Sequence, residues 1–145
     1  MTEPAPIELA GIHEALGQVR VVSTDGDGGR TVIEYRCAPY MCHSGGVAQG
    51  GFVCGWIDAA MAHAAMAALG RDLAPMSLEL KVSFFAPARP GAVFAEGWVE
   101  RAGRSVAFLE GRLTNAAGDV IAKASSTARL VPRANVEARS RAEIE

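Results

Sequence analysis

The segment from Gly50 to Leu69 most constrains how this chain can fold, because it is apolar on every side. From Cys37 to Gly70 the only formally charged residue is Asp58. The glycines at its start and Gly70 after Leu69 predict a helix that begins at Gly50 or Gly51 and ends at Leu69. A helix without a polar face must be covered all round, so we expect a sheet, or a sheet and a partner chain, to wrap it.

Strand patterns lie on both sides of this helix. The alternation of apolar residues and the turn sequences between them predict two strands before the helix and four after it. One helix with an antiparallel sheet is an α+β arrangement, and we expect a single domain over residues 1–145 with its core at about 18–131. The predicted strands are 18–23, 30–37, 76–85, 93–101, 105–114 and 120–131.

Composition excludes several classes of protein. Half of the residues are hydrophobic and the net charge is -2, which is typical of a globular protein and argues against nucleic acid as the main partner. Asp58 and His63 interrupt the apolar helix, so a buried helix is expected rather than a membrane span. The first residues lack the basic and apolar regions of a secretory signal, and the three cysteines lack metal spacing. We therefore expect a cytoplasmic protein with free thiols and no bound metal.

Asp58 is the candidate for chemistry. A lone carboxylate in apolar surroundings is costly unless it is paired, hydrogen-bonded or protonated. Gly50 and Gly51 stand at the expected helix start, where free N–H groups can bind a carbonyl oxygen that becomes an oxyanion. A carboxylate can act on such a carbonyl as general base or nucleophile. These elements together suit acyl transfer or hydrolysis.

The spacing of these groups adds a constraint. Asp58 follows Gly50 by eight residues, which is roughly 12 Å along a helix. One carbonyl can hardly contact both groups of the same chain. A shared site would need the helix start of one subunit beside Asp58 of another, so we expect a homo-oligomer with its site at the subunit interface.

The sequence resembles a known family in two segments. The run from Gln49 to Asp58 is similar to the HGGxxxxLxD segment of hotdog-fold acyl-CoA thioesterases of the phenylacetate-pathway, or PaaI-like, type. The run from Ser77 to Ala88 resembles the strand of that family that ends in a Pro-Ala turn. The resemblance covers roughly residues 30–131 and implies a hotdog fold, in which a five- or six-stranded antiparallel sheet wraps the long helix and subunits pair as dimers or dimers of dimers.

The resemblance also implies the hydrolysis of an acyl-CoA thioester to a free acid and CoA, without a further cofactor. Asp58 would be general base or nucleophile, and Gly50 of the partner would donate its N–H to the thioester oxygen. Ser77 would help to place water or the carboxylate. Two positions depart from the family pattern: Gln49 replaces the motif histidine and would brace the loop, and His43 replaces the usual amide near the carbonyl. We also expect Gln49 and Gly51 to be substrate-binding residues, Phe52, Trp56 and Met61 to line the acyl pocket, and Arg89 and Arg104 to meet the CoA phosphates.

Two alternatives remain open from the sequence. One is a non-catalytic hotdog module that binds acyl-CoA or small aromatic molecules, which the changes at Gln49 and His43 would permit. The other is a hotdog hydratase or dehydratase. His63 stands about 140° round the helix from Asp58, which disfavours the paired Asp and His that such an enzyme would need. Acyl chain length, an aromatic or aliphatic preference, and dimer or tetramer are not specified by the sequence.

Overall fold

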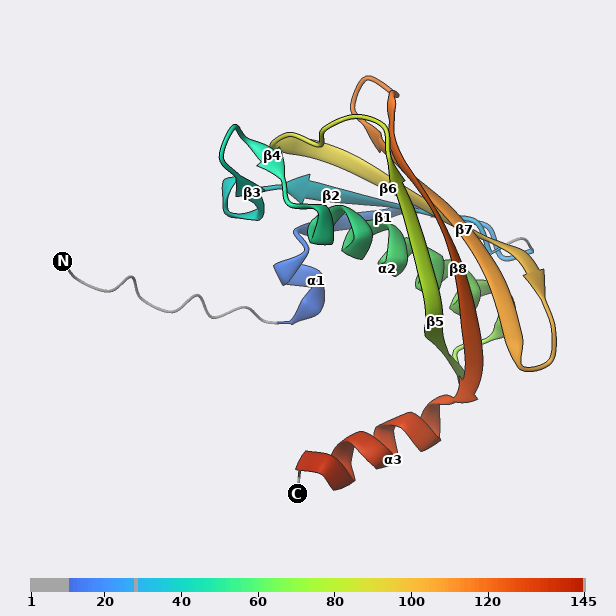
Figure 1. Ribbon diagram of the computed structural model, residues 1–145. Coiled ribbons are helices and arrows are strands. Elements are labelled where there is room, and N and C mark those ends of the chain that lie inside the picture. The colour runs from blue at the N-terminus through green and yellow to red at the C-terminus, as the bar shows by residue number, and fades with distance from the viewer. Residues whose placement is uncertain (1–10, 28, 145) are drawn as a thin grey trace.

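The computed structural model describes residues 11–27 and 29–144, and its main feature is one six-stranded antiparallel sheet. The strands lie in the order β1-β2-β6-β7-β8-β5. The sheet curves round the long helix α2, Gly50–Leu69, as Figure 1 shows. The predicted α+β architecture is confirmed. The strands are β1 (Gln18–Thr24), β2 (Thr31–Cys37), β5 (Leu73–Phe84), β6 (Gly91–Ala102), β7 (Val106–Asn115) and β8 (Val120–Pro132).

Shorter elements complete the chain. A single helical turn, α1, precedes β1, and α3 follows β8 and extends away from the sheet (Figure 1). The loop between β2 and α2 contains a 3-10 turn and a small hairpin. These elements are α1 (Ile12–Ala15), η1 (Pro39–Met41), β3 (Cys42–His43), β4 (Val47–Ala48) and α3 (Arg133–Ile144).

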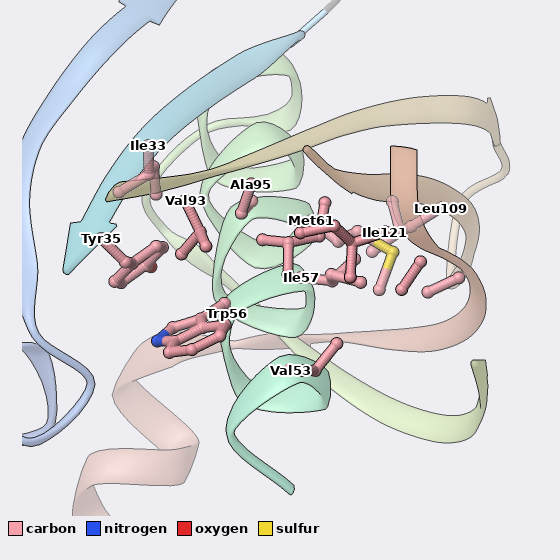
Figure 2. Close-up of a cluster of buried hydrophobic side chains, with 14 of the residues drawn as sticks. Ile33, Tyr35, Val53, Trp56, Ile57, Met61, Val93, Ala95, Leu109 and Ile121 are labelled. Carbon is pink, nitrogen blue, oxygen red and sulfur yellow. The ribbon is translucent and has the colours of Figure 1, made fainter. Parts of the chain in front are cut away.

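The core lies between α2 and the concave face of the sheet. Trp56, Ile57 and Met61 of α2 are fully buried there against apolar side chains from the sheet strands (Figure 2). The ring of Tyr35 stacks on Trp56 with 6.2 Å between the ring centres. The Trp56 indole donates a hydrogen bond of 2.7 Å to the carbonyl of Leu16, which satisfies its polar atom inside the core.

Two glycines bring the sheet unusually close to the helix. Gly97 of β6 and Gly111 of β7 are cross-strand partners beneath α2. A Cβ atom at Gly97 would lie 2.5 Å from the backbone nitrogen of Met61, and one at Gly111 would lie 2.6 Å from the Ile57 side chain. Only glycine permits this approach, so the pair fixes how deeply α2 sits in the sheet.

The expectation that α2 is buried nearly all round is met on one side only. Its buried residues follow a helical period and face the sheet, whereas the opposite side is half-exposed. Within the described ranges α2 is the one helix that is long and apolar enough to cross a bilayer, and its packing on the sheet identifies it as the core helix. The buried residues are Val53, Trp56, Ile57, Ala60, Met61, Ala64 and Ala65.

Strand β5 forms one edge of the sheet and carries exposed apolar side chains. Among residues 11–27 and 29–144 it pairs only with β8, so one side of its backbone has no strand partner there. Met76, Leu78 and Leu80 alternate along it and are 46%, 64% and 38% exposed. A long apolar edge strand is a surface that another chain can extend.

Candidate active site

The loop before α2 is held against the sheet by backbone hydrogen bonds. The hairpin of β3 and β4 turns at Gly45 and Gly46, both of which have positive φ angles that favour glycine. The Ala48 N–H donates to the Ala88 carbonyl over 2.8 Å, and the Gln49 N–H donates to the Met41 carbonyl over 2.8 Å. These bonds fix the position at which α2 starts.

At the helix start one N–H group stays available. The Gln49 side chain caps the helix, because its Oε1 accepts a hydrogen bond of 2.8 Å from the Gly51 N–H. The Phe52 N–H donates to the Gln49 carbonyl over 2.9 Å. Among the described residues the Gly50 N–H has no hydrogen-bond partner. It is therefore the donor that a ligand oxygen can reach.

A pocket of about 440 Å³ opens beside this N–H group. Its walls combine the helix start at Gly50 and Val53 with the end of β5 at Phe84 and Phe85. The Pro87-Ala88 turn closes another side. An apolar pocket with a free backbone donor at its edge suits an uncharged carbonyl compound.

Asp58 lies two turns further along α2 and faces β5. The Ser77 hydroxyl donates to its Oδ1 over 3.4 Å. Burial raises the pKa of the Asp58 carboxyl, and the hydrogen bond from Ser77 partly lowers it. A half-buried carboxylate with a raised pKa, in contact with one hydroxyl, is suited to accept a proton.

Within one chain Gly50 and Asp58 do not meet. They lie in one uninterrupted helix, so the axial separation of roughly 12 Å expected from helix geometry applies. Gly50 lies next to the Phe84 ring, whereas Asp58 contacts Ser77, seven residues earlier in β5. The structure therefore joins Asp58 to Ser77 but keeps both away from the Gly50 N–H group of the same chain.

Three polar candidates occupy exposed positions. His43 lies in the hairpin, and its Nδ1 is 3.0 Å from the Ser44 carbonyl. The Arg89 guanidinium donates to the Gly45 carbonyl over 3.4 Å, which joins it to the same hairpin. Arg104 lies in the turn between β6 and β7, at the end of the sheet far from Gly50 of its own chain.

The predicted aromatic lining needs correction. Trp56 and Met61 are fully buried between α2 and the sheet, and neither lines the pocket beside Gly50. Phe52 is half-buried and packs edge-on against Tyr40, with 6.2 Å between the ring centres. Phe84 and Phe85, which line the pocket beside Gly50, were not predicted as pocket residues. Their place at the end of an edge strand becomes visible only once the strand order is known.

A curved antiparallel sheet wrapped round one long helix is the architecture of the hotdog class, and here that helix has a glycine at its start and carries a carboxylate. The sequence model of the Thioesterase superfamily matches residues 45–122, and the chain belongs to that superfamily. The matched residues include both Gly50 and Asp58. None of the curated protein sequences compared with the chain matches it.

Solved structures agree with this assignment. The phenylacetic acid degradation-related protein of Ralstonia eutropha is 26% identical, with a TM-score of 0.76 over 85% of this chain and 92% of that one. Zebrafish thioesterase superfamily member 2 is also 26% identical, with a TM-score of 0.75 over 86% and 89% of the two chains. The Escherichia coli PaaI protein, from the phenylacetic acid degradation operon, is 20% identical, with a TM-score of 0.74 over 82% and 83%. The hotdog fold and the PaaI-like resemblance are thereby confirmed.

Proposed function

We propose that the protein hydrolyses an acyl- or aryl-CoA thioester to a free acid and CoA. The observation that carries the proposal is that one thioesterase-superfamily chain has both of two groups. One is the Gly50 N–H, which lies at a pocket and has no hydrogen-bond partner among the described residues, and the other is a half-buried Asp58 that accepts a hydrogen bond from Ser77. The first group suits an oxyanion and the second suits activation of water. Their separation along α2 supports a site shared by two subunits.

The apolar edge of β5 supports the same arrangement. Asp58 and Gly50 lie beside different parts of this strand, next to Ser77 in its first half and to Phe84 at its end respectively. Antiparallel pairing of two β5 strands about a two-fold axis close to Leu80 would set Ser77 opposite Phe84 of the partner subunit. Asp58 of one subunit would then approach the partner's Gly50, and the exposed apolar residues of β5 would be covered. A dimer has two such sites, and a dimer of dimers has four.

In the proposed reaction the thioester carbonyl oxygen accepts a hydrogen bond from the Gly50 N–H. Asp58 of the other subunit takes a proton from water while the water oxygen bonds to the carbonyl carbon. The carbon–sulfur bond then breaks, and the proton passes to the CoA thiolate. In the second route, which we keep open, the Asp58 carboxylate attacks the carbonyl itself and water hydrolyses the resulting anhydride. Ser77 orients the carboxylate in both.

The pocket beside Gly50 is the proposed place for the acyl group or the adjoining pantetheine arm, with Val53, Phe84 and Phe85 as its apolar walls. His43 stands on the hairpin next to this pocket and Arg89 donates a hydrogen bond to that hairpin, and both are proposed to contact the coenzyme side. Arg104 could meet a CoA phosphate only from the other subunit, because it lies at the far end of its own sheet. No metal enters the proposed reaction, and no cluster of three or more potential metal ligands occurs within the part of the chain that the structure describes.

A cytoplasmic location belongs to the same proposal. Cys37, Cys42 and Cys54 are free thiols in the structure, which suits a reducing compartment.

A thiol-release assay over a panel of aryl- and alkyl-CoA esters tests the activity. We expect wild-type protein to release CoA from at least one ester, and Asp58→Asn to lose about 10²–10⁴-fold in rate. If Asp58→Asn hydrolyses as fast as wild type, the mechanism is wrong. If no ester releases CoA while acyl-CoA still binds, the protein is the non-catalytic binding module instead. A single turnover in water labelled with oxygen-18 separates the two routes. Label in the released acid and none in Asp58 indicates a general base, whereas label in Asp58 indicates a nucleophile.

A further inference from the structure

A second cavity, distinct from the pocket at Gly50, lies between α1, β1, β2 and α2. It has a volume of about 300 Å³, at the small end of the range for ligand sites. Its apolar wall is formed by Ile33 from the sheet and by Ala59 and Met66 from one face of α2. None of Gly50, Asp58 and Ser77 lines it.

One residue of the cavity lining has a buried polar atom without a partner among the described residues. Tyr35 lines the cavity, its side chain is fully buried, and its hydroxyl has no hydrogen bond among the described residues. Burial raises the pKa of the Tyr35 hydroxyl to about 12, so it keeps its proton and can act as a donor. A buried hydroxyl left unpaired is unfavourable, and a ligand or water in the cavity would satisfy it.

Of the four other polar side chains that line the cavity, Gln18 is uncharged and three carry or can carry positive charge. His13 from α1, His63 from α2 and Arg71 after the helix all line it, and its described lining holds no carboxylate. Burial lowers the pKa of His63, and the nearby Arg71 and His13 lower it further. Positive charge on His63 is therefore opposed by Arg71 and by His13, and an anion in the cavity would relieve that repulsion.

We propose that this cavity binds a small monocarboxylic acid with an apolar tail. The carboxylate takes hydrogen bonds from Arg71, His63 and the Tyr35 hydroxyl, and the tail packs on the Ala59 and Met66 side of the helix. The inference does not depend on the thioesterase proposal, because it uses neither Asp58 nor Gly50. It adds a second binding site, whose ligands are of the same chemical class as the acids that thioester hydrolysis would release.

Isothermal titration of the full-length protein with benzoate and with hexanoate tests the site, with benzamide as the uncharged control. We expect at least one of the two acids to bind and benzamide to bind at least tenfold more weakly. Arg71→Gln and Tyr35→Phe should each weaken the acid by about tenfold, because a hydrogen bond to a charged group is lost. Lys123→Gln, which removes an exposed positive charge elsewhere, should bind as wild type does.

Two further readouts keep the test decisive. Tyr35→Phe should unfold at the same temperature as wild type or higher without acid, since it removes an unpaired hydroxyl, yet lose most of the stabilisation that the acid provides. Asp58→Asn should retain acid binding. The inference is overturned if neither acid binds and the cavity holds water only, or if Arg71→Gln and Tyr35→Phe bind as wild type does. It is also overturned if acid binding is lost in Asp58→Asn, which would assign the acid to the catalytic site.

Discussion

Substitution of Gly97 by alanine should force α2 away from the sheet. The new Cβ atom would lie 2.5 Å from the Met61 nitrogen and 2.6 Å from the Ala60 carbonyl carbon and oxygen. Ordinary contact begins near 3.4 Å, so the helix backbone would have to move by about 0.9 Å. Backbone atoms cannot rotate aside as a flexible side chain can, and we expect a cost near the upper end of overpacking, about 3 kcal/mol.

For a domain of this length that cost corresponds to a fall of roughly 9 °C in the unfolding temperature, measured by circular dichroism. Gly103→Ala is the matched control, because its Cβ would make only one contact, at 3.4 Å to the Val106 carbonyl oxygen. At a temperature where both variants are folded, Gly97→Ala should also lose thioesterase activity, since a shift of α2 displaces Asp58 and Gly50. An unfolding temperature within about 1 °C of the control would refute the account of helix packing.

Three further changes test the site. Gly50→Pro removes the free N–H at a helix position that tolerates proline and should lower kcat about 10²–10³-fold, whereas Gly50→Ala keeps this N–H and should retain most activity. Equal rates for the two variants would exclude an oxyanion role for the Gly50 N–H. Ser77→Ala removes a hydrogen bond that lowers the pKa of Asp58, so the acidic limb of the plot of kcat/KM against pH should move to higher pH. If the limb does not move, Ser77 does not influence the pKa of Asp58. Because folding raises the pKa of Asp58, the free energy of unfolding of wild type falls as the pH rises from the unfolded to the folded pKa, so Asp58→Asn should be more stable than wild type at neutral pH and lose that advantage below the unfolded pKa. Urea unfolding at pH 7 and pH 3 measures this difference in stability, and a variant less stable than wild type at pH 7 would contradict the raised pKa of Asp58.

Local features of the fold could be predicted from the sequence because they depend on neighbouring residues. The glycines and the apolar run place α2 at Gly50–Leu69 as expected, and the strand patterns fall within a few residues of the observed strands. The order of strands depends on long-range pairing, which local patterns do not encode. That order makes β5 an edge strand, and it puts Phe84 and Phe85 beside Gly50.

Burial was harder to predict than secondary structure. Trp56 and Met61 lie in an apolar run in which any residue could belong either to the core or to a ligand pocket. Only the position of the sheet relative to α2 places these two in the core. The glycines at 97 and 111 carried a readable signal, because glycine inside a strand often marks the close approach of another backbone. The separation of Gly50 from Asp58 followed from helix geometry alone, and it remains the strongest reason to expect a shared site.

Complementation between two inactive variants tests the shared site most directly. Asp58→Asn and Gly50→Pro are co-expressed with different tags, and the mixed oligomer is purified through both tags. If each site combines Asp58 of one subunit with Gly50 of the other, every mixed dimer contains one intact site and should show about half of the wild-type rate. If both groups act within one chain, each chain of the mixed dimer carries a defect, and activity no higher than that of the separate variants would contradict the account.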